Sequence, residues 1–330
     1  MKNKILATLI AFGLVGSASA DIKINDNLSI KGFIDGSYQS VDNDSTTHDA
    51  AELELDEVEI DFLFTTGAIS AEVHLDSSLN GTNAGDDNIN IEQAHFSYSL
   101  DNGLKITVGR YGSSLGLEGQ DPAGLYTYSR AYGDNNFNFG DVDSQSYEGL
   151  AFNYDADKFS VGLSVHNKTT RATALEVANA NGDENDLDLE LSFAFAPTDE
   201  LTIGAGFAQV NGAVIGGAVP ADIDAMNINA TYTVGKLLLG GEWSQIDAGN
   251  VTDQDAYMLL LDYDVSKVLG VAVRYSQWDT TANNDADQIT VAPNYSITDN
   301  LGAILEYSNL NDSATGLDQD TIAVELTYTF

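Results

Sequence analysis

The chain has no cysteine and four prolines among 330 residues. Without cysteine there is no disulfide framework, so backbone pairing and packing must hold the fold. After the first 20 residues, no segment approaches 18 consecutive apolar residues, which excludes a membrane-spanning helix. The sequence contains no zinc-ligand spacing, no Gly-rich phosphate loop and no G-x-S-x-G, so we expect no metal, no cofactor and no catalytic residue.

Basic residues are also scarce, with 13 against 51 acidic residues and a formal charge of −38. A chain with this charge repels nucleic acid and attracts cations, so we expect no nucleic-acid partner. Strong acidity can indicate disorder. Here the content of 43% hydrophobic and 9% aromatic residues favours a folded chain.

The first 20 residues have the pattern of a secretory signal peptide. Lys2 and Lys4 precede an apolar run at 5–15, and a small-x-small site at 18–20 predicts cleavage before Asp21. The apolar run is too short for a membrane anchor. The remaining 21–330 carries 11 basic and 51 acidic residues, and we expect it to form one domain.

Apolar and polar residues alternate through most of this domain. In 187–195 the odd positions are Leu or Phe, and in 322–330 the even positions are apolar. Alternation of this length predicts strands with one apolar and one polar face. About sixteen such segments occur, at 28–38, 52–64, 68–77, 89–100, 103–111, 145–154, 158–167, 186–196, 200–209, 224–234, 236–246, 255–264, 268–278, 287–297, 300–309 and 319–330.

The links between these segments alternate between short and long. The short links contain tight-turn residues, such as those at 101–103 and 298–300. The long links are 39–51, 78–88, 112–144, 168–185, 210–223, 247–254, 279–286 and 310–318. This alternation predicts an all-β transmembrane antiparallel barrel of about 16 strands in the cell outer membrane, with short periplasmic turns and long outer loops.

Aromatic residues support this layout, because they lie near the predicted strand ends in the outward phase, as in the girdles of membrane barrels. They are Tyr38, Tyr98, Tyr154, Phe195, Phe207, Tyr232, Trp243, Tyr257, Tyr263, Tyr275, Tyr295, Tyr307, Tyr328 and Phe330. Three segments are irregular, of which 89–100 alternates less cleanly than most. A phase change in 52–64 predicts a bulge near Asp56-Glu57 or a strand that begins near Glu57. Pro293 removes a ladder donor inside a strand pattern, which a bulge or register shift would absorb.

The polar phase predicts the residues that face the lumen, and among these the acids outnumber the bases. They are Lys31, Asp35, Glu57, Glu59, Asp61, Glu72, His74, Asp76, His95, Lys105, Asp188, Glu190, Glu242, Asp262, Asp264, Arg274, Glu306 and Glu325. Acidic rings favour cations in a pore, so we expect a mild cation preference. Most of these acids, taken singly, are expected to be solvated and only to keep the lumen wet.

The segment 106–118, ITVGRYGSSLGLE, resembles the VGR…LG.E segment of Gram-negative porins, and is most similar to that of the OmpL-like β-barrel porins. The YSR stretch at 128–130 follows as it does in that family, whereas the PEFGG loop tip of general diffusion porins is missing. The resemblance implies a water-filled channel for small hydrophilic solutes and ions, and leaves a homotrimer open.

In porins, the resemblance implies, the third loop folds into the lumen and forms the constriction. Here that loop is 112–144, and its length also favours a functional role. It holds Glu118, Asp121, Arg130 and Asp134. Arg110 is expected beside it if the strand ends there, although strict alternation places Arg110 outward.

The C-terminal Tyr328-Thr329-Phe330 resembles the signal read by the barrel-assembly machinery. Acidic outer links at 42–44, 86–88, 183–186 and 283–285 could bind Ca²⁺ or Mg²⁺ and so bridge to lipopolysaccharide, although solvated loops are the simpler interpretation. Outer-membrane lipid is the expected surrounding.

Three alternatives to a porin remain open. The first is an outer-membrane enzyme, which the scattered histidines and missing motifs disfavour. The second is a narrow or plugged barrel with a structural or adhesive role. The third is a β-solenoid, whose links would not alternate in length.

Overall fold

The computed structural model describes residues 21–43, 50–78, 89–118, 121–133, 137, 147–167, 187–213, 221–247, 253–281 and 284–330. The predicted signal peptide, 1–20, lies outside these residues. In the described part of the chain, the one helical segment is a 3-10 turn, η1 (Pro122–Gly124). None of the described residues forms a helix long and apolar enough to cross a membrane.

Each segment predicted from alternation overlaps one long strand of the structure. The strands are β2 (Leu28–Asn43), β3 (Ala50–Thr66), β4 (Ile69–Ser78), β5 (Asn90–Ser99), β6 (Leu104–Tyr111), β7 (Tyr147–Asp155), β8 (Phe159–His166), β9 (Asp188–Phe195), β10 (Leu201–Ala213), β11 (Ala221–Val234), β12 (Leu237–Asp247), β13 (Gln254–Asp264), β14 (Leu269–Thr281), β15 (Asn284–Ser296), β16 (Leu301–Asp312) and β17 (Leu317–Thr329). A two-residue strand, β1 (Ile22–Lys23), pairs with β2.

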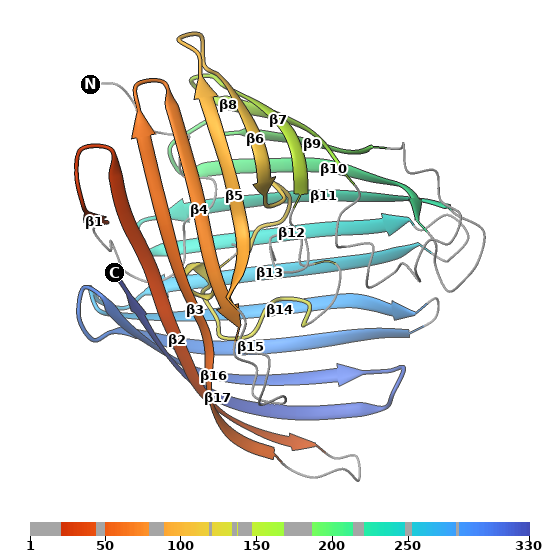
Figure 1. The fold of residues 1–330 in the computed structure, drawn as a ribbon. Helices are drawn as coiled ribbons and strands as arrows, with labels where there is room; N and C mark the ends of the chain where they lie inside the picture. The colour runs from red at the N-terminus through yellow and green to blue at the C-terminus, as the bar shows by residue number, and fades with distance from the viewer. Residues whose placement is uncertain are drawn as a thin grey trace.

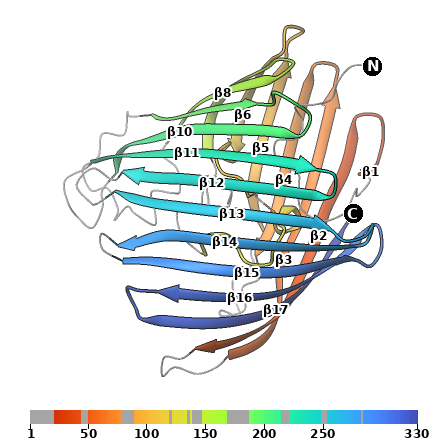
Figure 2. The same ribbon diagram turned by 180° about the vertical axis from the view of Figure 1, so that it is seen from behind.

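The strands form a closed barrel (Figures 1 and 2). Each strand from β2 to β17 pairs antiparallel with its neighbours along the chain, and β17 pairs with β2 over eleven residue pairs from Gln319↔Asn43 to Thr329↔Phe33. Closure leaves none of these sixteen described strands at an open edge of the sheet. The predicted sixteen-strand antiparallel barrel is confirmed.

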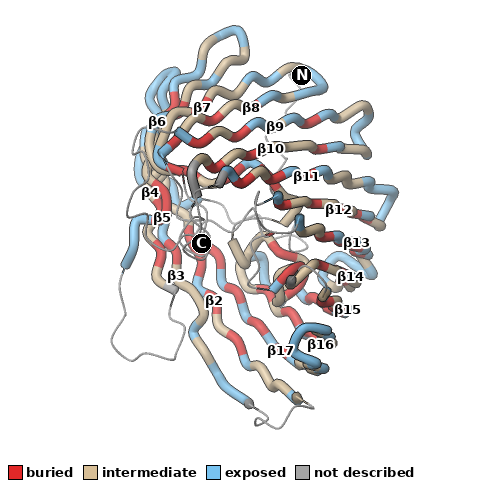
Figure 3. Tube along the Cα trace, turned by 90° about the vertical axis from the view of Figure 1, so that its right-hand side faces the viewer, coloured by how far each residue is buried: buried red, intermediate tan, exposed pale blue. Residues whose placement is uncertain are grey.

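The outside of the barrel is apolar, and burial alternates along the strands (Figure 3). In β17, Ile322, Val324, Leu326 and Tyr328 are exposed, while the residues between them from Ala323 onward are buried. Exposed aromatic side chains lie beside the short links, at Tyr98, Tyr154, Tyr232, Tyr263, Tyr295 and Tyr328. This arrangement suits a barrel surrounded by hydrocarbon with aromatic residues at an interface.

The predicted bulge in the second segment is confirmed. Asp35 pairs with Glu57 and Gly36 pairs with Leu55, so Asp56 is the extra residue. The expectation for Pro293 is wrong, because no register shift accompanies it. The β15–β16 ladder lacks pairs at 292 and 293, and the pairs Val291↔Tyr307 and Asn294↔Ile304 keep one register. The ladder therefore accommodates the missing donor as a local gap.

Candidate functional site: the inner wall and the crossing loop

The described part of the loop between β6 and β7 runs through the barrel interior. We call residues 112–144 the crossing loop, of which 112–118, 121–133 and 137 are described. Its contacts reach β14, which lies on the opposite side of the strand ring from β6 and β7. The prediction that this link folds inward therefore agrees with the described part of the loop, seen between the walls in Figures 1 and 2.

Arg274 of β14 holds the loop to this opposite wall. Its Nη1 lies 2.6 Å from Glu118 Oε1 and 2.7 Å from the carbonyl oxygen of Ser129. Its Nη2 donates to Ser129 Oγ at 2.8 Å and to the carbonyl oxygen of Arg130 at 2.9 Å. The Arg274 side chain is fully buried, so this set of acceptors compensates a charge that would otherwise be very costly inside the barrel.

Other wall residues contact the same stretch of the crossing loop. Glu306 Oε2 of β16 accepts a hydrogen bond from Ser129 N at 3.1 Å. Tyr132 Oη donates to Glu242 Oε1 of β12 at 3.0 Å, and Tyr128 Oη lies 3.1 Å from Ser37 Oγ of β2. The predicted site residues Glu118, Arg274 and Glu306 thus lie together as anchors of the loop.

The first residues of the loop are fixed by a separate carboxylate, Glu190 of β9. Its Oε2 accepts from Ser113 Oγ at 2.7 Å and from Tyr147 Oη at 2.8 Å, and its Oε1 accepts from Ser114 N at 2.8 Å. The Tyr147 ring stacks on His166 with centroids 3.9 Å apart. The start of the crossing loop and the first residue of β7 therefore meet at one buried acceptor.

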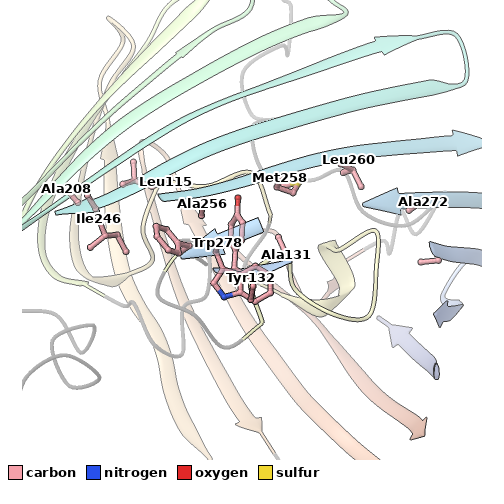
Figure 4. Packing of buried hydrophobic residues seen from close by; sticks show 14 of the residues in the cluster. Leu115, Ala131, Tyr132, Ala208, Ile246, Ala256, Met258, Leu260, Ala272 and Trp278 are labelled. Carbon is pink, nitrogen blue, oxygen red and sulfur yellow. The ribbon is translucent and has the colours of Figure 1, made fainter. Parts of the chain in front are cut away.

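Apolar packing holds the crossing loop against the inner surface of β10–β16. Alternation predicts a polar inner surface, so this apolar contact is not expected from the sequence. Leu115, Ala131, Tyr132 and Phe137 belong to one buried cluster with wall residues that include Ala208, Ile246, Ala256, Met258, Leu260, Ala272 and Trp278 (Figure 4). The Tyr132 and Trp278 rings meet edge to face with centroids 6.1 Å apart. The lumen is therefore not lined by polar residues throughout.

Two wall glycines make room for the loop. A Cβ atom on Gly206 would lie 1.8 Å from Leu115 Cδ2, and one on Gly240 would lie 3.1 Å from Leu117 Cδ2. Gly206 gives Leu115 the room for its close approach, whereas a Cβ on Gly240 would require its neighbour Leu117 to shift by only a few tenths of an ångström.

The acids of β2–β4 and β17 that are predicted to face the lumen do face inward, but most of them are buried rather than solvated. Asp35, Glu59, Asp61, Asp76 and Glu325 are each at most 2% exposed. The expectation of singly solvated acids is therefore wrong for these five, because neighbouring side chains and the η1 segment, which packs on β2, exclude water. The predicted site residues Glu57 and Glu72 remain half-buried.

Lys31 forms an ion pair on this inner wall, with its Nζ 3.0 Å from Asp61 Oδ2. His74 lies beside the same carboxylate, with Nδ1 3.2 Å from Asp61 Oδ1 and 3.1 Å from Glu59 Oε1. The structure thus brings the predicted residues Lys31, Glu59, Asp61 and Glu72 into one cluster around His74.

Glu92 also belongs to this cluster, and strict alternation had missed it. His74 pairs with Gln93 and Leu75 pairs with Ile91, so Glu92 is the extra residue of a bulge in β5, and it is buried. A bulge re-aims side chains in this way. The sequence carries a signal, because the apolar phase changes from Ile89 and Ile91 to Phe96 and Tyr98.

Burial changes the proton affinity of several groups in the crossing loop. It raises the pKa of Asp121, which the nearby charge of Lys31 partly offsets. It raises the pKa of Tyr128 to about 12, against a smaller lowering by the Ser37 hydroxyl. Burial and then the Glu242 carboxylate raise the pKa of Tyr132 as well. The loop tyrosines therefore remain neutral hydrogen-bonding groups over the ordinary pH range.

Two predicted arginines, Arg110 and Arg130, have different outcomes. Arg110 pairs with Ala94 and Glu148 in the phase of exposed Val108, so its expected place in the lumen is wrong, because β6 keeps alternating to its end. Arg130 lies at the loop anchor through its carbonyl oxygen.

The C-terminal residues Tyr328 and Phe330 lie where β17 meets β2 and closes the barrel. Phe330 N donates to the carbonyl oxygen of Gly32, and Gly32 N donates to that of Phe330, each at 2.9 Å. The Tyr328 and Phe330 rings have centroids 6.0 Å apart.

Comparison with known proteins agrees with this geometry. A family model described as Gram-negative porin matches residues 6–329. The anion-selective porin from Comamonas acidovorans is similar with a TM-score of 0.69 at 17% identity, over 92% of this chain and 99% of that chain. The outer membrane channel DcaP of Acinetobacter baumannii is similar with a TM-score of 0.71 at 12% identity, over 94% of this chain and 100% of that chain. Salmonella typhi OmpF in complex with daunomycin is similar with a TM-score of 0.66 at 15% identity, again over 94% of this chain and 100% of that chain. No curated protein sequence matches.

Proposed function

This chain belongs to the Gram-negative porin family, and from that premise we propose that it forms a water-filled channel for passive diffusion of small hydrophilic solutes and ions, with a mild cation preference. As a porin it is an outer-membrane channel. The family match does not single out the OmpL-like group, which stays a prediction.

The inward-facing acids support the cation preference. Glu57 of β3 and Glu72 of β4 face the interior and are only half-buried, and neither strand carries a lysine or an arginine. Carboxylates inside a pore raise the local concentration of cations. The Comamonas acidovorans porin is described as anion-selective, but at 17% identity its likeness concerns the fold alone.

The crossing loop supports a constriction, and its anchoring by Arg274 is the observation that carries the proposal. A loop bound to the opposite wall narrows the interior at a defined place. We assign Glu118, Asp121 and Arg130 to that place, with Glu57, Glu59, Asp61, Glu72, Lys31, Arg274 and Glu306 on the surrounding wall.

The decisive test is single-channel conductance in a planar bilayer with a KCl gradient. We expect stepwise openings and a reversal potential of the sign that indicates cation preference. Asp121→Asn removes one loop carboxylate and should weaken that preference, whereas Asp157→Asn in an exposed short turn should leave it unchanged. An anion-selective reversal potential in the wild type would contradict the charge argument.

A narrow or plugged barrel is the second candidate, favoured by the apolar cluster between the crossing loop and β10–β16. The same experiment separates the two functions. A folded barrel that never conducts would overturn the porin proposal and favour a structural or adhesive role. We assign no catalytic residue, no cofactor and no nucleic-acid partner.

The maturation and assembly that we propose are those of an exported barrel. Residues 1–20 are removed, the barrel-assembly machinery reads Tyr328 and Phe330, and the protein resides among outer-membrane lipid and lipopolysaccharide, with a homotrimer open. Mass spectrometry of the purified protein should give an N-terminus at Asp21, and native gels should report the oligomeric state. The acidic outer links lie largely outside the described residues.

A further inference from the structure

Three inward-facing side chains of adjacent strands form a compact group of metal-binding atoms. Glu59 of β3, His74 of β4 and Glu92 of β5 each offer one ligand atom, and these atoms all lie within 4.8 Å of one another. All three side chains are more than nine-tenths buried. The β5 bulge turns Glu92 onto this wall, so the group depends on an irregular feature of the barrel.

A fourth residue fixes the orientation of the imidazole. His74 Nε2 lies 3.3 Å from Glu72 Oε2. A histidine that donates one ring N–H to a carboxylate presents the lone pair of its other nitrogen, which is the usual arrangement behind a metal ligand. Nδ1 of His74 then faces the group, 3.1 Å from Glu59 Oε1 and 3.9 Å from Glu92 Oε2.

The atoms at the centre of the group lack hydrogen bonds. His74 Nδ1, Glu59 Oε1 and Asp61 Oδ1 are buried and have no hydrogen-bond partner, although they are close together. Their short separations therefore place polar atoms together without a well-formed hydrogen bond between them. Buried charges of one sign are costly unless a cation compensates them.

Lys31 does not supply that cation for the whole group. Its ammonium lies 3.0 Å from Asp61 Oδ2, the carboxylate oxygen that faces away from His74. Bonds of about 2.0 to 2.2 Å in a tetrahedral zinc site place ligand atoms roughly 3.3 Å apart. The 3.1 and 3.9 Å separations lie on either side of that value, and all three ligand atoms lie within 4.8 Å of one another.

We propose that Glu59, His74 and Glu92 bind a divalent first-row transition cation of the Zn²⁺ class. Imidazole nitrogen combined with carboxylate oxygen suits such ions, whereas Ca²⁺ and Mg²⁺ prefer all-oxygen sites. Asp61 lies beside the site, and Glu72 is a positioning residue that orients His74. The bound ion would join β3, β4 and β5 on the inner wall, a property that a diffusion channel does not require.

The test is Zn²⁺ binding to the purified, folded full-length barrel in detergent, by competition with a chromophoric chelator. We expect one ion per chain with a micromolar or tighter Kd. His74→Gln should weaken binding at least about 10-fold, and Glu72→Gln about 10- to 100-fold. His166→Gln, which changes another buried inward-facing histidine on β8, should bind as the wild type does. Excess Ca²⁺ should not displace Zn²⁺.

Absence of Zn²⁺ binding would overturn the site and leave a protonated His74 as the compensating charge. Equal binding by the wild type and His74→Gln would also overturn it, by assigning Zn²⁺ to other carboxylates. If His74→Gln fails to give a heat-modifiable barrel, anomalous diffraction at the zinc edge of the wild type decides, through a peak or its absence between the three residues. These measurements record binding, so they are independent of whether the channel conducts.

Discussion

Arg274 Nη1 lies 2.6 Å from Glu118 Oε1, although 156 residues separate the two along the chain. The pair joins β14 to a loop that leaves the barrel wall on the opposite side. One contact therefore couples the position of the loop to the wall of the pore, and it can be broken without altering any strand pairing.

Replacing Arg274 by Met should release the crossing loop. Glu118 and the carbonyl oxygens of Ser129 and Arg130 would lose the guanidinium as a donor, and removing one partner of a buried ion pair costs roughly 3 to 5 kcal/mol. We expect a larger or noisier single-channel conductance and a lower temperature for the heat-induced gel shift. Arg110→Met removes the same charge from the outward phase of β6 and should change neither measurement. Unchanged conductance in Arg274→Met would contradict the loop as the constriction.

Gly206→Ala should displace the start of the crossing loop. The added methyl group would meet Leu115 Cδ2 at 1.8 Å, and overpacking of this kind typically costs about 1 to 3 kcal/mol. Gly241→Ala is the control, since its Cβ would find only ordinary contacts, at 3.5 Å from Leu259 Cδ2. Thermal unfolding followed by gel mobility should separate the two variants. Equal stability would indicate that Leu115 does not occupy this position.

Tyr128 should make the folded barrel sensitive to alkali. Its pKa is raised to about 12 by burial, above the ordinary value of about 10. Because the unfolded chain loses this proton first, stability falls as the pH rises from about 10 toward 12, by up to roughly 2 kcal/mol, since Tyr128 is only partly buried and solvent screens part of the effect. Tyr128→Phe should remove that part of the loss, and Tyr98→Phe on the outer surface controls for loss of a phenol. Identical alkaline unfolding of the wild type and Tyr128→Phe would refute the assignment.

Phe330→Ala should reduce the yield of folded barrel. Phe330 exchanges two backbone hydrogen bonds with Gly32 at the closing strands, and its ring lies against that glycine. The backbone bonds survive the substitution, so a loss of yield would come from the ring. Cells that express the variant should show less heat-modifiable protein in their outer membranes, while refolding of the purified chain in detergent separates assembly from stability. Full yield in both settings would argue against a role in assembly.

Alternation along the chain was sufficient to predict the sixteen strands and the inward place of most acids, because side-chain direction in a strand has a period of two. The phase change near Asp56 also located a real bulge. The same kind of phase change occurs between Ile91 and Phe96. Strict alternation takes no account of that change, and so it predicts that Glu92 faces outward, whereas the bulge turns it inward.

Contacts of the crossing loop could not be predicted from the local pattern. The pairing of Glu118 with Arg274, and the seating of Leu115 on Gly206, join segments far apart in sequence. Periodicity describes which face a residue occupies but not what covers that face. For the same reason, the sequence predicted solvated acids where the structure has buried ones.

The extra residue at position 92 has a genetic consequence. Loss of this single codon would restore regular pairing between β4 and β5, and would remove a carboxylate from the inner wall without shifting residues 93–99 relative to β4. Gain or loss of the Glu59–His74–Glu92 group among related barrels should therefore follow one-residue insertions and deletions in this strand. Comparisons that score only substitutions would overlook such a change.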